Sequence, residues 1–150
     1  MDDRLIQEVR TEATKKINRD LVLDIMGTDI DARMVEIAKE NAQKAGVASD
    51  ITFKQMRVQD LRSEKINGVI ISNPPYGERL SDDAGVTKLY AEMGEVFEPL
   101  RTWSKFILTS DENFEKKFGR QADKKRKLYN GTLKVDLYQF FGERVRRQAT

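Results

Sequence analysis

The most specific chemical feature of the chain is a loop that follows a short apolar run and reads Asn73-Pro74-Pro75-Tyr76. The two prolines fix φ and bias Asn73 toward an extended conformation, so this loop is stiff. It would hold the Asn73 amide and backbone carbonyls as acceptors, and Tyr76 would offer a face for stacking. Such a set suits an exocyclic amine on a flipped or single-stranded nucleobase, although a rigid turn with a packed tyrosine is the alternative.

Acidic residues follow two other strand-like segments. Asp29 and Asp31 come at the end of residues 21–29, and Asp60 follows residues 51–58. A carboxylate at Asp29 could accept from both ribose hydroxyls of a nucleotide-like cofactor, and one at Asp60 could accept from an amine such as that of adenine. The alternatives are local, because aspartates also cap helices and form turns.

The composition narrows the chemistry further. The 150 residues include no Cys and no His, which excludes disulfides, thiolate nucleophiles, imidazole bases and Cys or His metal sites, and we expect no metal. The length suits about one domain. No run approaches the roughly 18 apolar residues of a membrane span, and the acidic start is unlike a signal peptide. We therefore expect a soluble, cytoplasmic protein that does not bind a membrane.

The first half of the chain predicts two helices and three strands. Apolar spacing indicates a helix over 3–19, a strand over 21–29 and a helix from Asp31, as its cap, to about residue 45, with Gly46 ending it. Residues 51–58 alternate as a strand. Residues 68–72 form a continuous apolar run, which is typical of a strand buried on both faces.

The second half predicts a helix over 85–100, a buried strand over 106–109 and a short helix that Asp111 caps and that runs to Phe118. Asn130-Gly131 predicts a type I′ hairpin turn between 125–129 and 132–141. Strands separated by helices indicate an α/β fold with a mostly parallel sheet, to which the terminal hairpin adds an antiparallel strand. Ligands bind at the carboxyl ends of strands in such sheets.

The segment Asn-Pro-Pro-Tyr resembles the signature of amino-methylating class I S-adenosylmethionine-dependent methyltransferases, which have a Rossmann-like fold. The longer stretch 68–80 (GVIISNPPYGERL) is similar to the group of N6-adenine-specific DNA methylases, and that group resembles 23S rRNA guanine-N2 methyltransferases with a THUMP domain. The likeness extends over about residues 5–147 and includes 27–41, 89–97, 107–111 and 121–131.

The resemblance implies a role for each candidate residue. Asp29 would hold the ribose of S-adenosylmethionine, Ile30 would pack on its adenine, and Asp60 would bind the adenine amine. Asn73, with the Pro74 carbonyl, would bind the target amine, and Tyr76 would stack on its base; Pro75 completes the motif. The implied chemistry is direct methyl transfer, which needs neither His nor Cys.

One departure from the family is the cofactor motif. The family's first strand ends in a Gly-rich turn, but no two of the nine glycines here are separated by a single residue. The chain therefore resembles part of a catalytic domain without the first strand, the Gly-rich loop or a THUMP domain. The missing strand would be central, so we expect the exposed sheet edge to be covered by self-association or by the helix over 3–19. We also expect the isolated chain to be inactive.

Charge is segregated along the chain. The total is 27 basic against 25 acidic residues, but residues 116–147 contain 11 basic and three acidic ones. A basic patch with nearby aromatic residues would suit a phosphate backbone, and a solvated hairpin face is the alternative. The resemblance implies a nucleic-acid substrate, with guanine N2 of 23S rRNA preferred. The alternatives are adenine N6 in DNA and a non-catalytic nucleic-acid-binding remnant.

Overall fold

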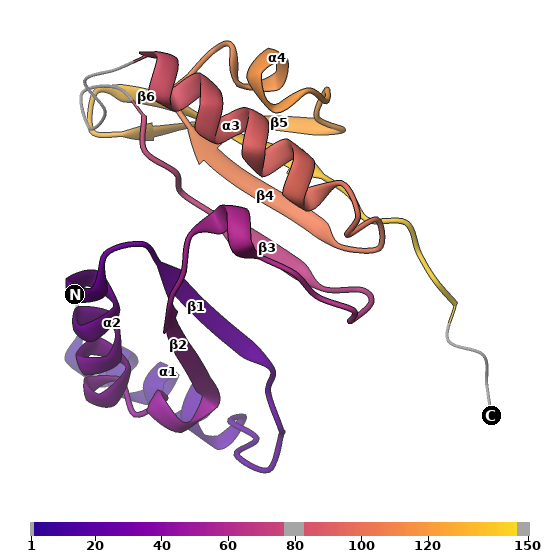
Figure 1. The fold of residues 1–150 in the computed structure, drawn as a ribbon. Coiled ribbons are helices and arrows are strands. Elements are labelled where there is room, and N and C mark those ends of the chain that lie inside the picture. The colour runs from indigo at the N-terminus through magenta and orange to yellow at the C-terminus, as the bar shows by residue number, and fades with distance from the viewer. Residues whose placement is uncertain (1, 77–82, 147–150) are drawn as a thin grey trace. The chain divides into compact units, whose positions relative to one another are not determined.

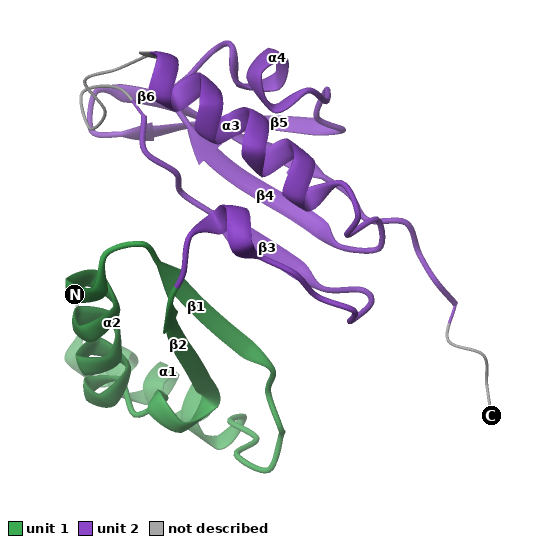
Figure 2. Ribbon diagram, viewed as in Figure 1, with its two compact units in different colours: residues 1–55 green, residues 56–150 purple. Residues whose placement is uncertain are grey.

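The computed structural model describes residues 2–76 and 83–146, and the chain forms two compact units, residues 1–55 and 56–150 (Figure 2). Each unit has its own sheet, so the sheet is not continuous along the chain. Residues 77–82, which follow the loop 73–76, and Arg147 of the basic segment lie outside the described residues. The described helices include none long and apolar enough to cross a membrane.

Unit 1 contains two parallel strands and two longer helices (Figure 1). Its elements are α1 (Asp3–Lys15), β1 (Ile25–Asp29), α2 (Ala32–Lys44), η1 (Ala48–Asp50) and β2 (Ile51–Gln55). The predicted strands over 21–29 and 51–58 were too long. Ile25 pairs with Ile51 and Asp29 with Gln55, so each strand has a partner only over these five residues.

The ends of α2 confirm the predicted capping. The Asp31 carboxylate accepts from the Arg33 amide at 2.9 Å, and Gly46 takes a φ of 74° just beyond the helix. An N-cap carboxylate and a left-handed glycine satisfy amide and carbonyl groups that a helix leaves free at its ends. By contrast α1 ends at Lys15 instead of residue 19, and none of its residues is buried.

Unit 2 contains a four-stranded sheet in the order β3-β4-β6-β5. The strands are β3 (Val69–Ser72), β4 (Ser104–Thr109), β5 (Lys124–Asn130) and β6 (Leu133–Phe140), and the helices are η2 (Val58–Asp60), α3 (Asp83–Phe97) and α4 (Phe114–Phe118). β3 and β4 are parallel, whereas β6 is antiparallel to both of its neighbours. This confirms parallel strands followed by a terminal antiparallel hairpin.

Apolar side chains of α3 and α4 cover one face of this sheet. Tyr90 and Phe97 of α3 and Phe114 of α4 are buried in one cluster with Tyr138 and Phe140 of β6. The Phe114 ring lies 5.1 Å from that of Tyr90 and 4.8 Å from that of Tyr138, which is a favourable range for aromatic pairs. The core of unit 2 therefore lies on the face of the sheet toward α3 and α4.

The expectation that residues 68–72 are buried on both faces was wrong. Val69 is 58% exposed and Ile71 is 81% exposed, whereas Ile70 is half-buried against the core. Val69 and Ile71 point to the second face of the sheet, which the described residues of unit 2 leave uncovered. The burial of successive side chains in β4 alternates for the same reason. Ile107 is buried on the covered face, whereas Phe106 is only half-buried.

Two local predictions in the second half also need correction. The helix α4 begins only at Phe114, so its N-cap is Asn113 and not Asp111. The Asp111 carboxylate instead accepts from the Asn113 amide, in the turn before the helix. The hairpin turn is not type I′. Gly131 has a φ of 64°, but Asn130 pairs with Leu133 as the last residue of β5 and has no positive φ. A positive φ at the first central position alone is typical of a type II′ turn.

Candidate active site

The loop 73–76 lies where the sequence places it, at the carboxyl end of β3. β3 runs parallel to β4, with Ser72 opposite Ile107, so both strands end at the same edge of the sheet. Pro74 is buried, Pro75 and Tyr76 are half-buried, and Asn73 is exposed. The prolines thus anchor the loop to the protein, while the amide next to them is open to solvent.

A buried tyrosine holds this loop in place. The Tyr90 hydroxyl, on α3, donates to the Pro75 carbonyl at 2.8 Å and lies 2.9 Å from the Thr109 hydroxyl. A phenol has one proton, so Thr109 must donate to Tyr90. The Asp111 amide in turn donates to the Thr109 oxygen at 3.1 Å. This chain of hydrogen bonds ties the loop to the end of β4.

Buried and charged groups surround this chain of hydrogen bonds. Tyr90 and Thr109 are completely buried, and burial raises the pKa of Tyr90, which keeps its hydroxyl protonated and able to donate. Asp111 forms a 2.6 Å ion pair with Lys117, and its carbonyl accepts from the Tyr138 hydroxyl at 3.1 Å. Both charged side chains of the pair are largely buried, so loss of either one would leave the other as an uncompensated buried charge.

Two acceptors of the loop remain available. In the part of the chain that the structure describes, no group forms a hydrogen bond with the Asn73 side chain or with the Pro74 carbonyl. The Pro75 carbonyl is the one that Tyr90 occupies. The loop therefore presents an amide oxygen and an adjacent carbonyl in the residues just before Tyr76, next to the proline carbonyl that Tyr90 holds.

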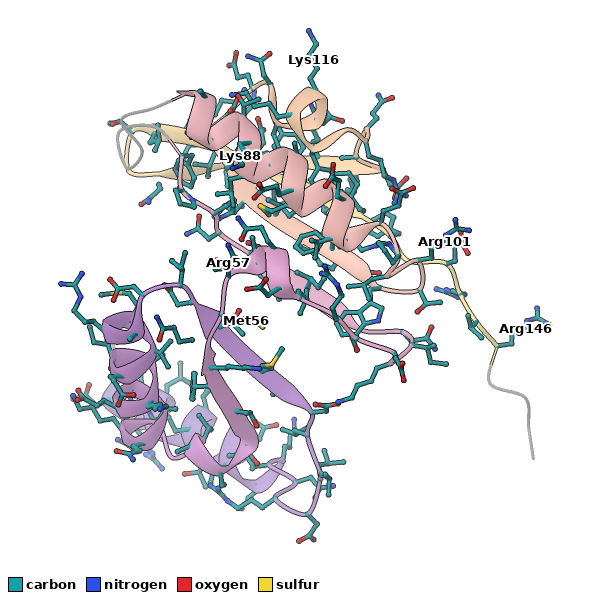
Figure 3. The ribbon with its side chains drawn as sticks, viewed as in Figure 1. Met56, Arg57, Lys88, Arg101, Lys116 and Arg146 are labelled. Carbon is teal, nitrogen blue, oxygen red and sulfur yellow. The ribbon has the colours of Figure 1, made fainter. Side chains whose placement is uncertain are left out.

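Asp60 lies on η2 in the same unit, and an arginine already contacts it. Both carboxylate oxygens accept from the Arg57 guanidinium at 3.1 Å, which lowers the pKa of Asp60. The pair is exposed, and each carboxylate oxygen can accept a second bond. Arg57 also lines a groove of about 460 Å³ between the η2 segment and α3, on which Lys88 lies (Figure 3).

Asp29 and Ile30 lie in unit 1, at the carboxyl end of β1. The Asp29 carboxylate accepts from the Asp31 amide at 2.8 Å, while Gln55 at the end of β2 donates to the Ile30 carbonyl at 3.0 Å. Ile30 is 64% exposed, so an apolar surface lies beside an exposed carboxylate. The local turn uses one Asp29 oxygen and leaves the carboxylate free to accept further bonds.

Each sequence-predicted residue therefore lies at a strand end or on the turn that follows a strand, with Asp60 and the loop 73–76 in unit 2 and Asp29 and Ile30 in unit 1. Sequence reasoning missed Tyr90 and Thr109. The available signal was a polar hydroxyl at an inward position of a predicted helix and another at the end of a buried strand. Among the described residues, no group of three or more acidic side chains could hold a metal ion.

Comparison with known proteins identifies relatives over nearly the whole chain. Residues 2–139 match the family described as RMKL-like, methyltransferase domain. The chain is 52% identical over 97% of its length to YpsC of Bacillus subtilis (strain 168), provisionally named an RNA methyltransferase, and spans 38% of that protein. It is 35% identical over 89% of its length to the ribosomal RNA large subunit methyltransferase K/L of Legionella pneumophila (strain Philadelphia 1), of which it spans 19%.

Solved structures give the same result. The crystal structure of SMU.472, provisionally named a methyltransferase and complexed with SAH, is 62% identical, with a TM-score of 0.88 over 97% of this chain and 39% of that one. A predicted N6-adenine-specific DNA methylase from Listeria monocytogenes is 48% identical, with a TM-score of 0.82 over 95% of this chain and 37% of that one. The chain thus spans well under half the length of these relatives.

Proposed function

The chain belongs to the RMKL-like methyltransferase domain family, and from this membership we propose that it forms part of a catalytic domain that methylates an exocyclic amine of an RNA base. Its fold is the Rossmann-like fold of class I methyltransferases. The names of the Bacillus and Legionella relatives support RNA as the substrate, and the SAH in SMU.472 supports S-adenosylmethionine as the methyl donor.

The observation that carries the proposal is the pair of available acceptors in the loop 73–76. An exocyclic amine has two N–H groups, and the Asn73 side-chain oxygen and the Pro74 carbonyl can accept one each. Tyr76 would stack on the base, as aromatic side chains do with splayed-out nucleotides. Holding both N–H groups orients the nitrogen lone pair and makes the amine more nucleophilic. None of these roles needs a thiol or an imidazole.

The residues assigned to the cofactor have suitable chemistry. When bound, S-adenosylmethionine supplies a methyl group activated by its sulfonium. The Asp29 carboxylate would accept from the ribose hydroxyls, Ile30 would pack on the adenine, and Asp60 would accept from the adenine amine beside its contact with Arg57. The sequence contains no Gly-x-Gly, so backbone approach to the methionine part would have to come from residues outside this sequence.

For the target we propose guanine N2 of 23S rRNA. The ribosomal RNA named in the Legionella relative supports the substrate class, and the acceptors at Asn73 and Pro74 suit any exocyclic amine. Adenine N6 in DNA is the second candidate, and the name of the Listeria structure favours it. A binding remnant without catalysis is the third, and the absent glycine motif favours that.

The test uses the protein encoded by the complete reading frame that contains this sequence, with cofactor labelled in its methyl group and either unmodified 23S rRNA or DNA. We expect label in rRNA guanine. Label in DNA adenine alone would refute the RNA proposal. Asn73→Ala should lower the rate on the order of 100-fold, because it removes one preorganised acceptor. Asn113→Ala is the matched control, since the Asn113 side chain caps nothing.

We also propose that the 150-residue chain alone binds S-adenosylmethionine weakly. Calorimetry with the isolated chain should give little or no heat of binding, and a tight dissociation constant would show that the Gly-rich motif is not needed. Among the described residues, β1 and β3 each have one edge without a partner strand, and this further leads us to propose that the isolated chain self-associates. A single monomer boundary in sedimentation velocity would contradict this second proposal.

A further inference from the structure

We infer that the outer edge of β5, formed by Lys124, Arg126 and Lys127, binds the phosphate backbone of the RNA whose base enters the loop at Asn73. The inference rests on the proposed function, because it takes the methylated RNA as the partner. Its evidence is the position of these three cations relative to that loop and their lack of ion-pair partners among the described residues. Both observations lie within unit 2.

The strand register shows where the three cations lie relative to the carboxyl edge of the sheet, at which the loop 73–76 begins. Lys127 pairs with Asp136, and Asp136 pairs with Thr109, the last residue of β4. Because β3 ends at the same edge as β4, the basic row runs alongside the second half of β4 and ends level with the carboxyl edge of the sheet. The remaining residues of the hairpin extend beyond that edge. The cations therefore lead toward Asn73 rather than toward the opposite end of the sheet.

The distance across the sheet suits a short stretch of RNA. Three interstrand spacings of about 4.8 Å separate β3 from β5, which gives about 14 Å. Successive phosphates of one strand are about 3.4 Å apart along a duplex axis and further apart in an extended strand. A strand with its target base at Asn73 would thus bring phosphates to β5 within a few nucleotides.

The three side chains have charges that the described protein does not neutralise. Lys124, Arg126 and Lys127 are exposed, and none forms an ion pair with a described residue. Lys125 differs, because its ammonium lies 3.4 Å from the Glu115 carboxylate and 5.6 Å from the centre of the Tyr138 ring. Intramolecular contacts therefore account for Lys125 but not for its three neighbours.

Further cations lie on the same side of the sheet as α4. Lys116 is exposed on α4 and points away from the body of unit 2 (Figure 3). Acidic side chains nearby are already engaged: Asp123 accepts from the Phe141 amide at 2.8 Å, and Asp136 lies 4.0 Å from Lys134. The surface therefore has a net positive charge that complements a polyphosphate.

An edge strand can also carry lysines for another reason, namely to prevent pairing with a second chain. Here the cations alternate between both faces of an edge strand, so long side chains from either face can reach around it. Arg126 adds a guanidinium, which can bind a phosphate with two parallel hydrogen bonds. The two explanations predict different behaviour when the charges are removed.

The test is the binding of a fluorescently labelled single-stranded RNA 20-mer to the 150-residue chain, measured by anisotropy between 50 and 300 mM KCl. The variant is Lys124→Gln/Arg126→Gln/Lys127→Gln. The control, Lys15→Gln/Lys16→Gln/Lys44→Gln, removes the same charge from the C-terminal ends of α1 and α2. Each lost phosphate contact lowers the salt slope by roughly 0.7, so the hairpin variant should lose about 2 from the slope and on the order of 10-fold to 100-fold in affinity at 0.1 M salt.

We expect the control to lose less than threefold and the hairpin variant to remain as soluble as the parent chain. Equal losses in the two variants, or no RNA binding by the parent chain, would overturn the inference. Unchanged RNA binding together with stronger self-association than the parent chain shows in sedimentation velocity would also overturn it, and would assign the cations to edge protection. The assay measures RNA binding and not methyl transfer. Its result can therefore be interpreted even if the chain proves to have no part in methylation.

Discussion

Replacing Tyr90 by Phe tests whether the hydroxyl chain under the loop 73–76 positions that loop. The change keeps the ring in the core and its edge-on contact with Phe114, and removes only the oxygen that donates to Pro75 and accepts from Thr109. A half-buried carbonyl then loses its donor, and a fully buried hydroxyl loses its acceptor. Leaving a buried polar group unsatisfied costs about 1–3 kcal/mol, so we expect a loss of about 2 kcal/mol in the free energy of unfolding.

Urea unfolding followed by the fluorescence of Trp103 measures this loss, because Trp103 is the only tryptophan and lies in unit 2. With a slope of roughly 2 kcal/mol per molar urea, the midpoint should fall by about 1 M at an unchanged slope. Thr109→Val removes the next hydroxyl. The double variant should lose less stability than the sum of the two single variants, because both changes break the same contact.

The control is Tyr138→Phe, which removes another buried tyrosine hydroxyl in the same core. That hydroxyl donates to the Asp111 carbonyl and does not contact the loop. Both variants should lose stability, but only Tyr90→Phe should lower the methylation rate of the complete protein, with little change in KM for S-adenosylmethionine. If the two variants lost activity equally, or if Tyr90→Phe left both stability and rate unchanged, Tyr90 would have no positioning role.

Three further predictions follow from the packing and the charges. Gly94→Ala would place a methyl group against the Phe118 carbonyl where α3 meets α4, so it should cost about 1–3 kcal/mol in urea unfolding, and a neutral result would contradict this packing. Burial raises the pKa of Tyr138 to about 12 from about 10, so the contribution of this group to the free energy of unfolding should be fully present below pH 10 and be lost as the pH rises past 12, a total of roughly 2.7 kcal/mol. In Tyr138→Phe the fall should be smaller, and an identical pH profile would exclude this tyrosine as the source. In Arg57→Gln the pKa of Asp60 should rise toward its ordinary value in an NMR titration, whereas an unmoved pKa would mean that the pair does not form in solution.

Local sequence signals determined much of the fold. The cap at Asp31 and the left-handed Gly46 set the limits of α2, because helix ends are fixed by groups within a few residues. The stiff loop at 73–76 could also be predicted from the sequence, since two adjacent prolines restrict the backbone wherever they occur. Parallel strands joined by helices and closed by a hairpin followed from the order of the patterns.

Tertiary structure decided what depends on residues far apart in the sequence. The contact of Tyr90 with Pro75 joins a helix to a loop 15 residues away, and no local pattern specifies it. The exposure of Val69 and Ile71 depends on which elements cover a sheet face, and an apolar run gives no information on that. β1 and β2 end where each loses its partner, which is a property of the pair. The sequence thus determined which groups could perform the chemistry, whereas packing decided that Pro75 is held and that Asn73 and the Pro74 carbonyl remain available.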